Sequence, residues 1–474
     1  MTESSPRRFN EQAADALQNV ELQQALNHMR AGFVQRRREA IDRLPEFEGL
    51  RDESQAIKNH TLDHLDLYLE AFEKKVTEQG GRVHWAKNAE EARRIVLEIC
   101  RAVDARTVTK GKSMIGEEIH LNAFLERNDI KPIETDLGEY IIQLRNEMPS
   151  HIIAPAIHVN KKRVAESFRE HHTKLPADRT LESRVDILAE ARSELRGRFV
   201  AAEVGITGAN FLIAETGTSV IVTNEGNGDL TQTLPQVHVV LASLEKVVPT
   251  LEDATTLLRV LARSATGQEM SVYTTFSSGP RRPDDPDGPE EYHVVLLDNG
   301  RSALYGTDFQ EIFRCIRCGA CLNHCPVYGA IGGHAYGSVY PGPIGKVLSP
   351  ALMGIDNAGN LPNASSFCGR CQEVCPMRIP LPKMMRHWRE VEFDRKLNTV
   401  RARWTLGLWA FFVRRPGLYR IATRLAVGLL SRCARRRGHF RTLPAAGDWT
   451  RHRNLPAPQG GTFQDRWRKK RLDR

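Results

Sequence analysis

Apolar residues recur at helical spacing among charged residues through the first eighty positions of the chain. Residues 14–44 and 56–79 both keep this spacing, and Leu65 and Leu69 illustrate it in the second stretch. We therefore expect residues 1–69 to form an N-terminal helical region.

From about residue 81 the pattern changes to short apolar runs that alternate with helical segments. Strands are expected at 82–85, 106–109, 130–134, 151–155, 211–214, 219–223, 237–242, 271–276 and 293–297. Helices are expected at 89–103, 117–126, 160–171, 181–198 and 251–264. This alternation is typical of an α/β layer fold with a mainly parallel sheet, which we assign to residues 70–300.

Beyond residue 300 the pattern predicts short helices and cofactor-wrapping loops. A short helix at 308–313 leads into a cysteine-rich stretch, and a helix is expected at 381–395, so residues 301–395 are assigned to an α-helical module. Residues 396–474 are expected to form a helical basic C-terminal domain. Its last thirty residues, polar and containing proline, are expected to be mobile.

The net charge of +9 is unevenly distributed over the 474 residues. Residues 401–474 contain nineteen Lys and Arg against three Asp and Glu, so the preceding part of the chain is mildly acidic. The sequence contains no run of eighteen uncharged apolar residues, so no transmembrane helix is expected. The N-terminus lacks the apolar core of a signal peptide. We therefore expect a cytoplasmic protein.

Seven of the nine cysteines lie in two short runs. The first run is Cys315, Cys318, Cys321 and Cys325, and the second is Cys368, Cys371 and Cys375; each ends in Cys-Pro. Three thiolates two residues apart suit one iron–sulfur cluster, whereas the fourth Cys, followed by Pro, ligates a different cluster. The doubled run therefore predicts two iron–sulfur centres that exchange ligands.

This rule assigns Cys315, Cys318, Cys321 and Cys375 to one centre, and Cys325, Cys368 and Cys371 to the other. The second centre is one thiolate short, because Ser365 stands where a complete motif has Cys. A [4Fe–4S] cluster with an unusual fourth ligand and a [3Fe–4S] cluster both fit, and we favour the former.

Two other uses of these cysteines are weighed against clusters. Zinc also binds Cys pairs two residues apart, but two triplets with Cys-Pro endings fit cluster geometry better. A disulfide framework suits short secreted chains, and this chain is long and shows no signal peptide.

Several other segments, together with the cysteine runs, resemble the lactate-utilisation iron–sulfur protein B family over essentially the whole chain. These segments are Thr109-Lys-Gly-Lys-Ser-Met114, Glu134-Thr-Asp-Leu-Gly-Glu139, Gly205-Ile-Thr-Gly-Ala-Asn210, Ala214-Glu-Thr-Gly-Thr218, Thr223-Asn-Glu-Gly226, Leu234-Pro-Gln-Val-His238 and the glycine-rich stretch 332–343. The resemblance implies a lactate-utilisation domain similar to sugar-phosphate isomerases and CoA-transferases. It also implies a two-cluster ferredoxin-type module with [4Fe–4S] clusters on the seven cysteines, and no eighth Cys.

The resemblance further implies that the chain is a subunit of a three-protein system that oxidises L-lactate to pyruvate. Its partners would be a second cysteine-rich protein and a further lactate-utilisation protein. The sequence leaves open which subunit performs the chemistry. It also leaves open an electron-transfer role for another dehydrogenase, of glycerol-3-phosphate or heterodisulfide type. A transferase- or isomerase-like α/β enzyme with purely structural clusters is a further alternative.

Charged residues near predicted strand ends suggest an anion pocket in the α/β domain. Lys110 and Lys112 would supply positive charge, and Asp136 and Glu215 are candidate site carboxylates. The alternative is that the neighbouring glycines only form turns and the lysines are solvated. No Gly-x-Gly-x-x-Gly motif follows a predicted strand, so a dinucleotide site has little support.

Other residues with ligand chemistry have ordinary explanations. His324 and His334 lie near the cysteines, but a loop position or a hydrogen bond is the simpler role for each. Cys100 falls among apolar helix positions and is expected to be a packed core thiol. Cys433 lies among arginines, which lower the pKa of a thiol without making it catalytic.

The basic C-terminal domain mixes Trp and Phe with Arg, which fits an amphipathic helix at an anionic membrane surface. The protein could then lie at the inner face of the membrane. A helical hairpin with a solvated tail explains the pattern equally well. Nucleic acid is not expected, because no recognised binding module accompanies the charge.

Overall fold

The computed structural model describes residues 5–176, 178–434, 437–443, 450 and 453–472. The chain divides into two compact units, Met1–Glu390 and Val391–Arg474. The first unit contains the six-stranded and the four-stranded sheet and all seven cysteines of the two runs.

Four helices precede the first strand, as the helical spacing predicts. They are α1 (Phe9–Gln18), α2 (Val20–Asp42), α3 (Phe47–Asp63) and α4 (Leu65–Glu78). The predicted stretch 14–44 is interrupted where Asn19 accepts a hydrogen bond from the Leu22 N–H at 3.0 Å and caps α2. The predicted stretch 56–79 is interrupted at His64, between α3 and α4.

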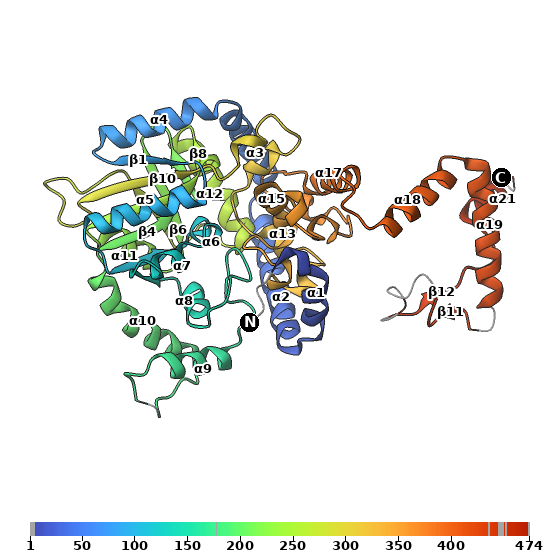
Figure 1. Ribbon diagram of the computed structural model, residues 1–474, viewed down its shortest axis with the longest axis horizontal. Coiled ribbons are helices and arrows are strands. Elements are labelled where there is room, and N and C mark those ends of the chain that lie inside the picture. The colour runs from blue at the N-terminus through green and yellow to red at the C-terminus, as the bar shows by residue number, and fades with distance from the viewer. Residues whose placement is uncertain (1–4, 177, 435–436, 444–449, 451–452, 473–474) are drawn as a thin grey trace. The chain divides into compact units, whose positions relative to one another are not determined.

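A six-stranded parallel sheet forms the centre of the first unit (Figure 1). Its strands are β1 (Arg82–Ala86), β2 (Thr107–Gly111), β3 (Lys131–Glu134), β4 (Val204–Gly208), β7 (Val237–Ser243) and β10 (Glu291–Leu297). Their order is β1-β10-β7-β4-β2-β3, and every neighbouring pair is parallel. The prediction of an α/β fold with a mainly parallel sheet is therefore confirmed.

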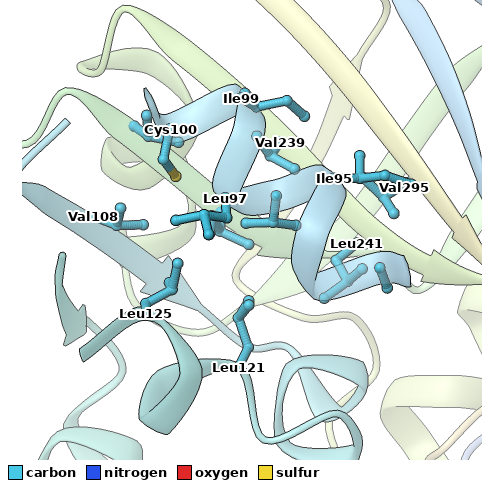
Figure 2. Close-up of a cluster of buried hydrophobic side chains, with 14 of the residues drawn as sticks. Ile95, Leu97, Ile99, Cys100, Val108, Leu121, Leu125, Val239, Leu241 and Val295 are labelled. Atoms are coloured by element: carbon cyan, nitrogen blue, oxygen red, sulfur yellow. The ribbon is translucent and has the colours of Figure 1, made fainter. Parts of the chain in front are cut away.

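The sheet is buried on both faces, so its inner strands are apolar at successive positions. Val239 and Val295 join a core cluster with α5 (Ala89–Ala102), which Figure 2 shows. The next residue on β7, Val240, instead packs with α4 side chains such as Phe72. Successive strand residues point to opposite faces, so each face receives its own apolar set.

A smaller four-stranded sheet lies beside the α4 core. Its strands are β5 (Phe211–Ile213), β6 (Thr218–Thr223), β8 (Val247–Val248) and β9 (Tyr273–Ser277), in the order β8-β5-β6-β9. The remaining helices of the α/β region are α6 (Met114–Glu118), α7 (Leu121–Glu126), α8 (Leu137–Leu144), α9 (Lys161–His171), α10 (Arg184–Ala201), α11 (Asn227–Thr233) and α12 (Leu251–Ala265).

Strand β4 and helix α11 are absent from the sequence-based prediction, and the predicted strand at 151–155 is irregular. Gly205 lies inside β4 with its Cα against α11. A Cβ there would stand 1.7 Å from the Thr231 carbonyl oxygen. The glycine therefore allows a close helix–strand contact, which periodicity does not reveal.

The cysteine-bearing segment folds into short helices packed against α1, α2 and α3. Its helices are α13 (Ala320–Asn323), α14 (Tyr328–Ile331), α15 (Gly342–Met353), α16 (Arg370–Glu373) and α17 (Leu381–Asp394). Short 3₁₀ turns are η1 (Pro6–Arg8), η2 (Leu244–Lys246), η3 (Ser302–Leu304), η4 (Gln310–Arg314), η5 (His334–Tyr336), η6 (Ile355–Asn357) and η7 (Leu361–Asn363).

The second unit contains helices α18 (Val400–Val413), α19 (Pro416–Cys433) and α21 (Phe463–Leu472), and a strand pair, β11 (His439–Phe440) and β12 (Leu455–Pro456). Much of its apolar surface is exposed, including Trp404 at 77% and Leu425 at 69%. Among the described residues, no helix is long and apolar enough to cross a membrane. Part of the predicted mobile tail, residues 445–449, 451–452 and 473–474, lies outside the described residues.

Candidate functional site

The two cysteine runs share a backbone conformation fifty residues apart. Arg317 and Gly319 flank Cys318 with φ of +61° and +72°, and Phe367 and Gly369 flank Cys368 with φ of +54° and +80°. Left-handed φ is costly for Arg and Phe, so the surrounding structure must hold these loops.

Each loop continues into a single helical turn that carries the next cysteine. The N–H of Leu322 in α13 donates to the Gly319 carbonyl at 2.9 Å, and the N–H of Gln372 in α16 donates to Gly369 at 3.0 Å. The same fifty-residue offset places Ser365 opposite Cys315.

Two pockets separate the seven cysteines into two sets. One pocket is lined by Cys315, Cys318, Cys321 and Cys375, and the other by Cys325, Cys368 and Cys371 together with Ser365. The last cysteine of each run thus lines the pocket of the other run. This is the arrangement that two cross-ligated clusters need.

The donor set suits a group larger than one ion. Within the described ranges, no three Cys, His, Asp or Glu side chains converge tightly enough to hold a single metal ion. Ligands of a zinc ion all lie about 2.3 Å or less from it, whereas the irons and sulfides of a cubane separate its thiolates more widely. Burial raises the pKa of Cys318 to about 12, so metal binding must overcome a cost of deprotonation.

Neither histidine near the cysteines lines these pockets. His324 Nδ1 lies 2.9 Å from the Ala320 carbonyl oxygen, and His334 Nε2 lies 2.7 Å from that of Met148. Cys100 is fully buried in the α5 core, where burial raises its pKa to about 12. Cys433 is exposed in the second unit.

Buried cations surround the two cysteine pockets. Lys346 of α15 is 1% exposed and donates to Cys325 Sγ at 3.7 Å. Arg51 donates to the Cys375 carbonyl at 2.8 Å, and Arg37 donates to the Val374 carbonyl at 2.9 Å. Such charges offset the negative charge that thiolate-ligated clusters carry.

Glu245, just after β7, joins the sheet to the first cysteine loop. Its carboxylate pairs with Arg317 at 3.1 Å and with Arg301 at 3.2 Å. Burial opposes ionisation, but the two guanidinium groups prevail and lower the pKa of Glu245 to about 2. Arg301 also pairs with Glu118 at 2.7 Å, whose carboxylate accepts from the Tyr340 hydroxyl.

A third pocket of about 160 Å³ lies at the carboxyl ends of the parallel strands. Lys112 and Asp136 line it and pair with each other at 2.7 Å. It shares Arg317 and Ile152 with the pocket of Cys315. Open α/β sheets bind ligands at this edge, so the pocket is a second candidate site.

The structure does not bring the four predicted anion-site residues together. Lys110 is buried between Glu117, at 2.6 Å, and Glu134, at 2.7 Å, so its charge is already compensated. Glu215 is exposed and accepts from the Leu251 N–H at the start of α12. Only Lys112 and Asp136 line the third pocket.

Sequence reasoning missed two cations that line the third pocket, Lys246 and Arg317. Neither of them is paired with Asp136. Lys246 lies three residues after the end of the apolar strand β7, and charged residues shortly after a buried strand are the signal that could have found it. Arg317 stands between two cysteines, whose spacing alone drew attention to that loop.

Comparison with known proteins agrees with this layout. Residues 69–297 match the LUD domain, 311–379 the 4Fe-4S dicluster domain, and 378–472 the domain described as Lactate utilisation protein B, C-terminal. A solved DUF162 family protein from Deinococcus radiodurans aligns with 49% of this chain and 98% of its own. At 15% identity and a TM-score of 0.26, this likeness is too weak to support an argument.

Curated relatives named Lactate utilization protein B align along nearly the whole chain. The protein from Bacillus cytotoxicus is 39% identical over 97% of both chains. That from Bacillus pumilus is 40% identical and that from Exiguobacterium sp. 42%, each over 98% of this chain and 97% of its own. The chain therefore belongs to the lactate utilization protein B family, with a 4Fe-4S dicluster domain and a role in lactate utilisation.

Proposed function

We propose that this chain is an electron-transfer subunit that seats two iron–sulfur clusters. Cys315, Cys318, Cys321 and Cys375 would hold the first, and Cys325, Cys368 and Cys371 the second. The observation that carries the proposal is the division of the cysteines between two pockets, each completed by the other run. Such clusters supply one-electron transfer when bound.

The second cluster would be [4Fe–4S] with a fourth corner not held by cysteine. Ser365 supports this proposal, because it lines the pocket and occupies the position equivalent to Cys315. Its hydroxyl oxygen accepts a hydrogen bond from the Phe367 N–H at 3.2 Å. Water, the serine oxygen or an outside ligand would complete the site.

Anaerobic purification tests the ligand sets. The full chain should contain iron and inorganic sulfide and give a paramagnetic signal after dithionite reduction. Cys375→Ser, although in the second run, should remove the first cluster's signal, whereas Cys325→Ser should remove the second cluster's. Cys433→Ser serves as the control and should keep both. Zinc in place of iron and sulfide, or loss of the same cluster in both variants, contradicts the assignment.

The clusters would serve a multi-protein system that oxidises L-lactate to pyruvate. Family membership supports lactate as the substrate, and a second cysteine-rich protein and a further lactate-utilisation protein would be the partners. Deleting the gene should abolish growth on L-lactate and leave growth on glycerol intact. Equal growth on both carbon sources, or loss only on glycerol, contradicts the proposal.

A cytoplasmic position at the inner face of the membrane would suit this role. The second unit supports it with exposed Trp404, Trp409 and Leu425 beside many arginines, a composition that binds anionic interfaces. Flotation of the full chain with anionic, but not neutral, lipid vesicles tests it. Failure to float with either contradicts it.

A further inference from the structure

Consecutive strands of the parallel sheet deliver polar side chains to one pocket. Lys112 follows β2, Asp136 follows β3, Asn210 follows β4, and Lys246 follows β7 by a single 3₁₀ turn. The cavity of about 160 Å³ is smaller than the roughly 300–1,000 Å³ typical of sites for drug-sized ligands. Its size suits a three-carbon acid rather than a nucleotide.

Two buried cations that line this pocket have unused hydrogen-bond donors. Lys246 is 8% exposed, and its Nζ has no hydrogen-bond or ion-pair partner among the residues that the structure describes. Arg317 is 9% exposed; its Nη2 donates to Glu245, but its Nε and Nη1 are buried without a partner. Buried donors left unmatched are costly, so an anion that accepts from Arg317 as well as from Lys246 would stabilise this part of the pocket.

The surrounding charges leave these two cations available. The carboxylate of Glu245 is divided between Arg301 and Arg317, and Lys112 is neutralised by Asp136 at 2.7 Å. The Arg317 guanidinium also stacks over the Tyr340 ring at 4.5 Å, which fixes its plane beside the pocket.

Another lining residue, Glu139, offers a different kind of group. Its Oε2 is buried and has no hydrogen-bond partner within the described part of the chain. Burial and the nearby Asp136 raise the pKa of Glu139 well above its ordinary value, which favours the protonated carboxyl, a group that can donate a hydrogen bond. The pocket thus combines cations for a carboxylate with a donor for a hydroxyl or oxo oxygen.

We propose that this pocket binds a small 2-hydroxy or 2-oxo monocarboxylate, with its carboxylate on Lys246 and Arg317. The inference rests on the proposed function in that lactate and pyruvate belong to this chemical class. Arg317 and Ile152 line both this pocket and the pocket of Cys315. A bound acid therefore lies beside the first cluster's ligands and not beside the second cluster's.

Calorimetry on the anaerobically purified full chain tests the proposal with pyruvate and L-lactate as probes. Saturable binding of at least one acid is expected, and Lys246→Gln and Arg317→Gln should each weaken it at least about tenfold. Lys246→Arg keeps the charge and should stay within about threefold of the unchanged protein. Lys75→Gln removes an exposed lysine on α4 and should have no effect.

Propionate lacks the oxygen that lactate and pyruvate carry on their second carbon, so it should bind more weakly than either acid. Glycerol 3-phosphate and inorganic phosphate test whether the pocket is a phosphate site. Preferred phosphate binding, or unchanged affinity in both Gln variants with native circular dichroism, overturns the proposal.

Cluster content separates the hypothesis of acid binding from the hypothesis of electron transfer. Redox-active clusters without acid binding overturn the pocket alone, whereas Lys246-dependent binding by protein without redox-active clusters overturns only the electron-transfer role.

Discussion

Lys346 offers the sharpest test of how the protein sets a cluster's reduction potential. Its ammonium is almost fully buried and donates to Cys325 Sγ at 3.7 Å. With about half the width of a cluster added beyond Sγ, an electron on a cluster bound there would lie about 7 Å from the ammonium. At an effective dielectric constant of about 20, that separation corresponds to roughly 2.4 kcal/mol. Since about 2.3 kcal/mol corresponds to 100 mV for one charge, the expected effect is about 100 mV.

The sign follows from the charge that reduction adds. A nearby ammonium stabilises the reduced cluster more than the oxidised one, and its hydrogen bond to sulfur acts in the same direction. Lys346→Met should therefore lower the potential of the cluster proposed for Cys325, Cys368 and Cys371 by about 100 mV. Burial lowers the pKa of Lys346, but the neighbouring thiolates of Cys325 and Cys371 oppose that shift.

Anaerobic redox titration followed by electron paramagnetic resonance measures the change. Lys346→Arg retains a cation and a donor, so its potential should stay within roughly 30 mV of the unchanged protein. The other cluster should move less, because Lys346 lines only the pocket of Cys325. An unchanged or raised potential in Lys346→Met, with both clusters present, would refute the electrostatic reasoning.

Three further predictions concern stability and the fourth ligand. The pKa of Glu245 is lowered from its ordinary value to about 2, so its stabilisation is present above pH 4.5 and is lost as pH falls toward 2. Denaturant unfolding should show Glu245→Gln about 3 kcal/mol less stable at pH 7, with the gap closing in acid; a gap independent of pH would contradict this. Gly205→Ala places a Cβ 1.7 Å from the Thr231 carbonyl and should cost about 3 kcal/mol by the same measurement, whereas Gly197→Ala, with open space, should cost nothing. Ser365→Cys completes the second ligand set and should slow oxidative loss of that cluster, measured by iron release in air; unchanged release argues against Ser365 at the fourth corner.

Local spacing predicted the features that depend on neighbouring residues. The cysteine runs specify their own loops, and apolar runs such as β7 and β10 specify buried parallel strands. The third pocket depends instead on contacts between distant segments. Lys246 and Arg317 are brought together by Glu245, and no periodicity in either segment records that pairing.

Lys110 shows the reverse case, in which a plausible site residue is already neutralised. Its position at the carboxyl end of β2 is correct for a ligand-binding lysine, but Glu134 of the neighbouring strand and Glu117 of α6 pair with its amine. Lys112, two residues further along the chain, does line the third pocket. Strand register, which only the folded sheet shows, decides which of two nearby lysines is available.

Besides Ser365 and Cys315, the two cysteine loops differ at a position that connects only one of them to the third pocket. Arg317 occupies the left-handed position before Cys318, and Phe367 occupies the same position before Cys368. The arginine reaches Glu245 and lines the third pocket, whereas Phe367 packs under the Arg389 guanidinium. Cys318 is buried and Cys368 is exposed, so the second set of ligands reaches the surface where a partner protein can approach. We therefore expect electrons from a bound acid to enter at the Cys315 site and leave at the Cys368 site, and substitutions on the surface around Cys368 to slow transfer to the partner without weakening acid binding.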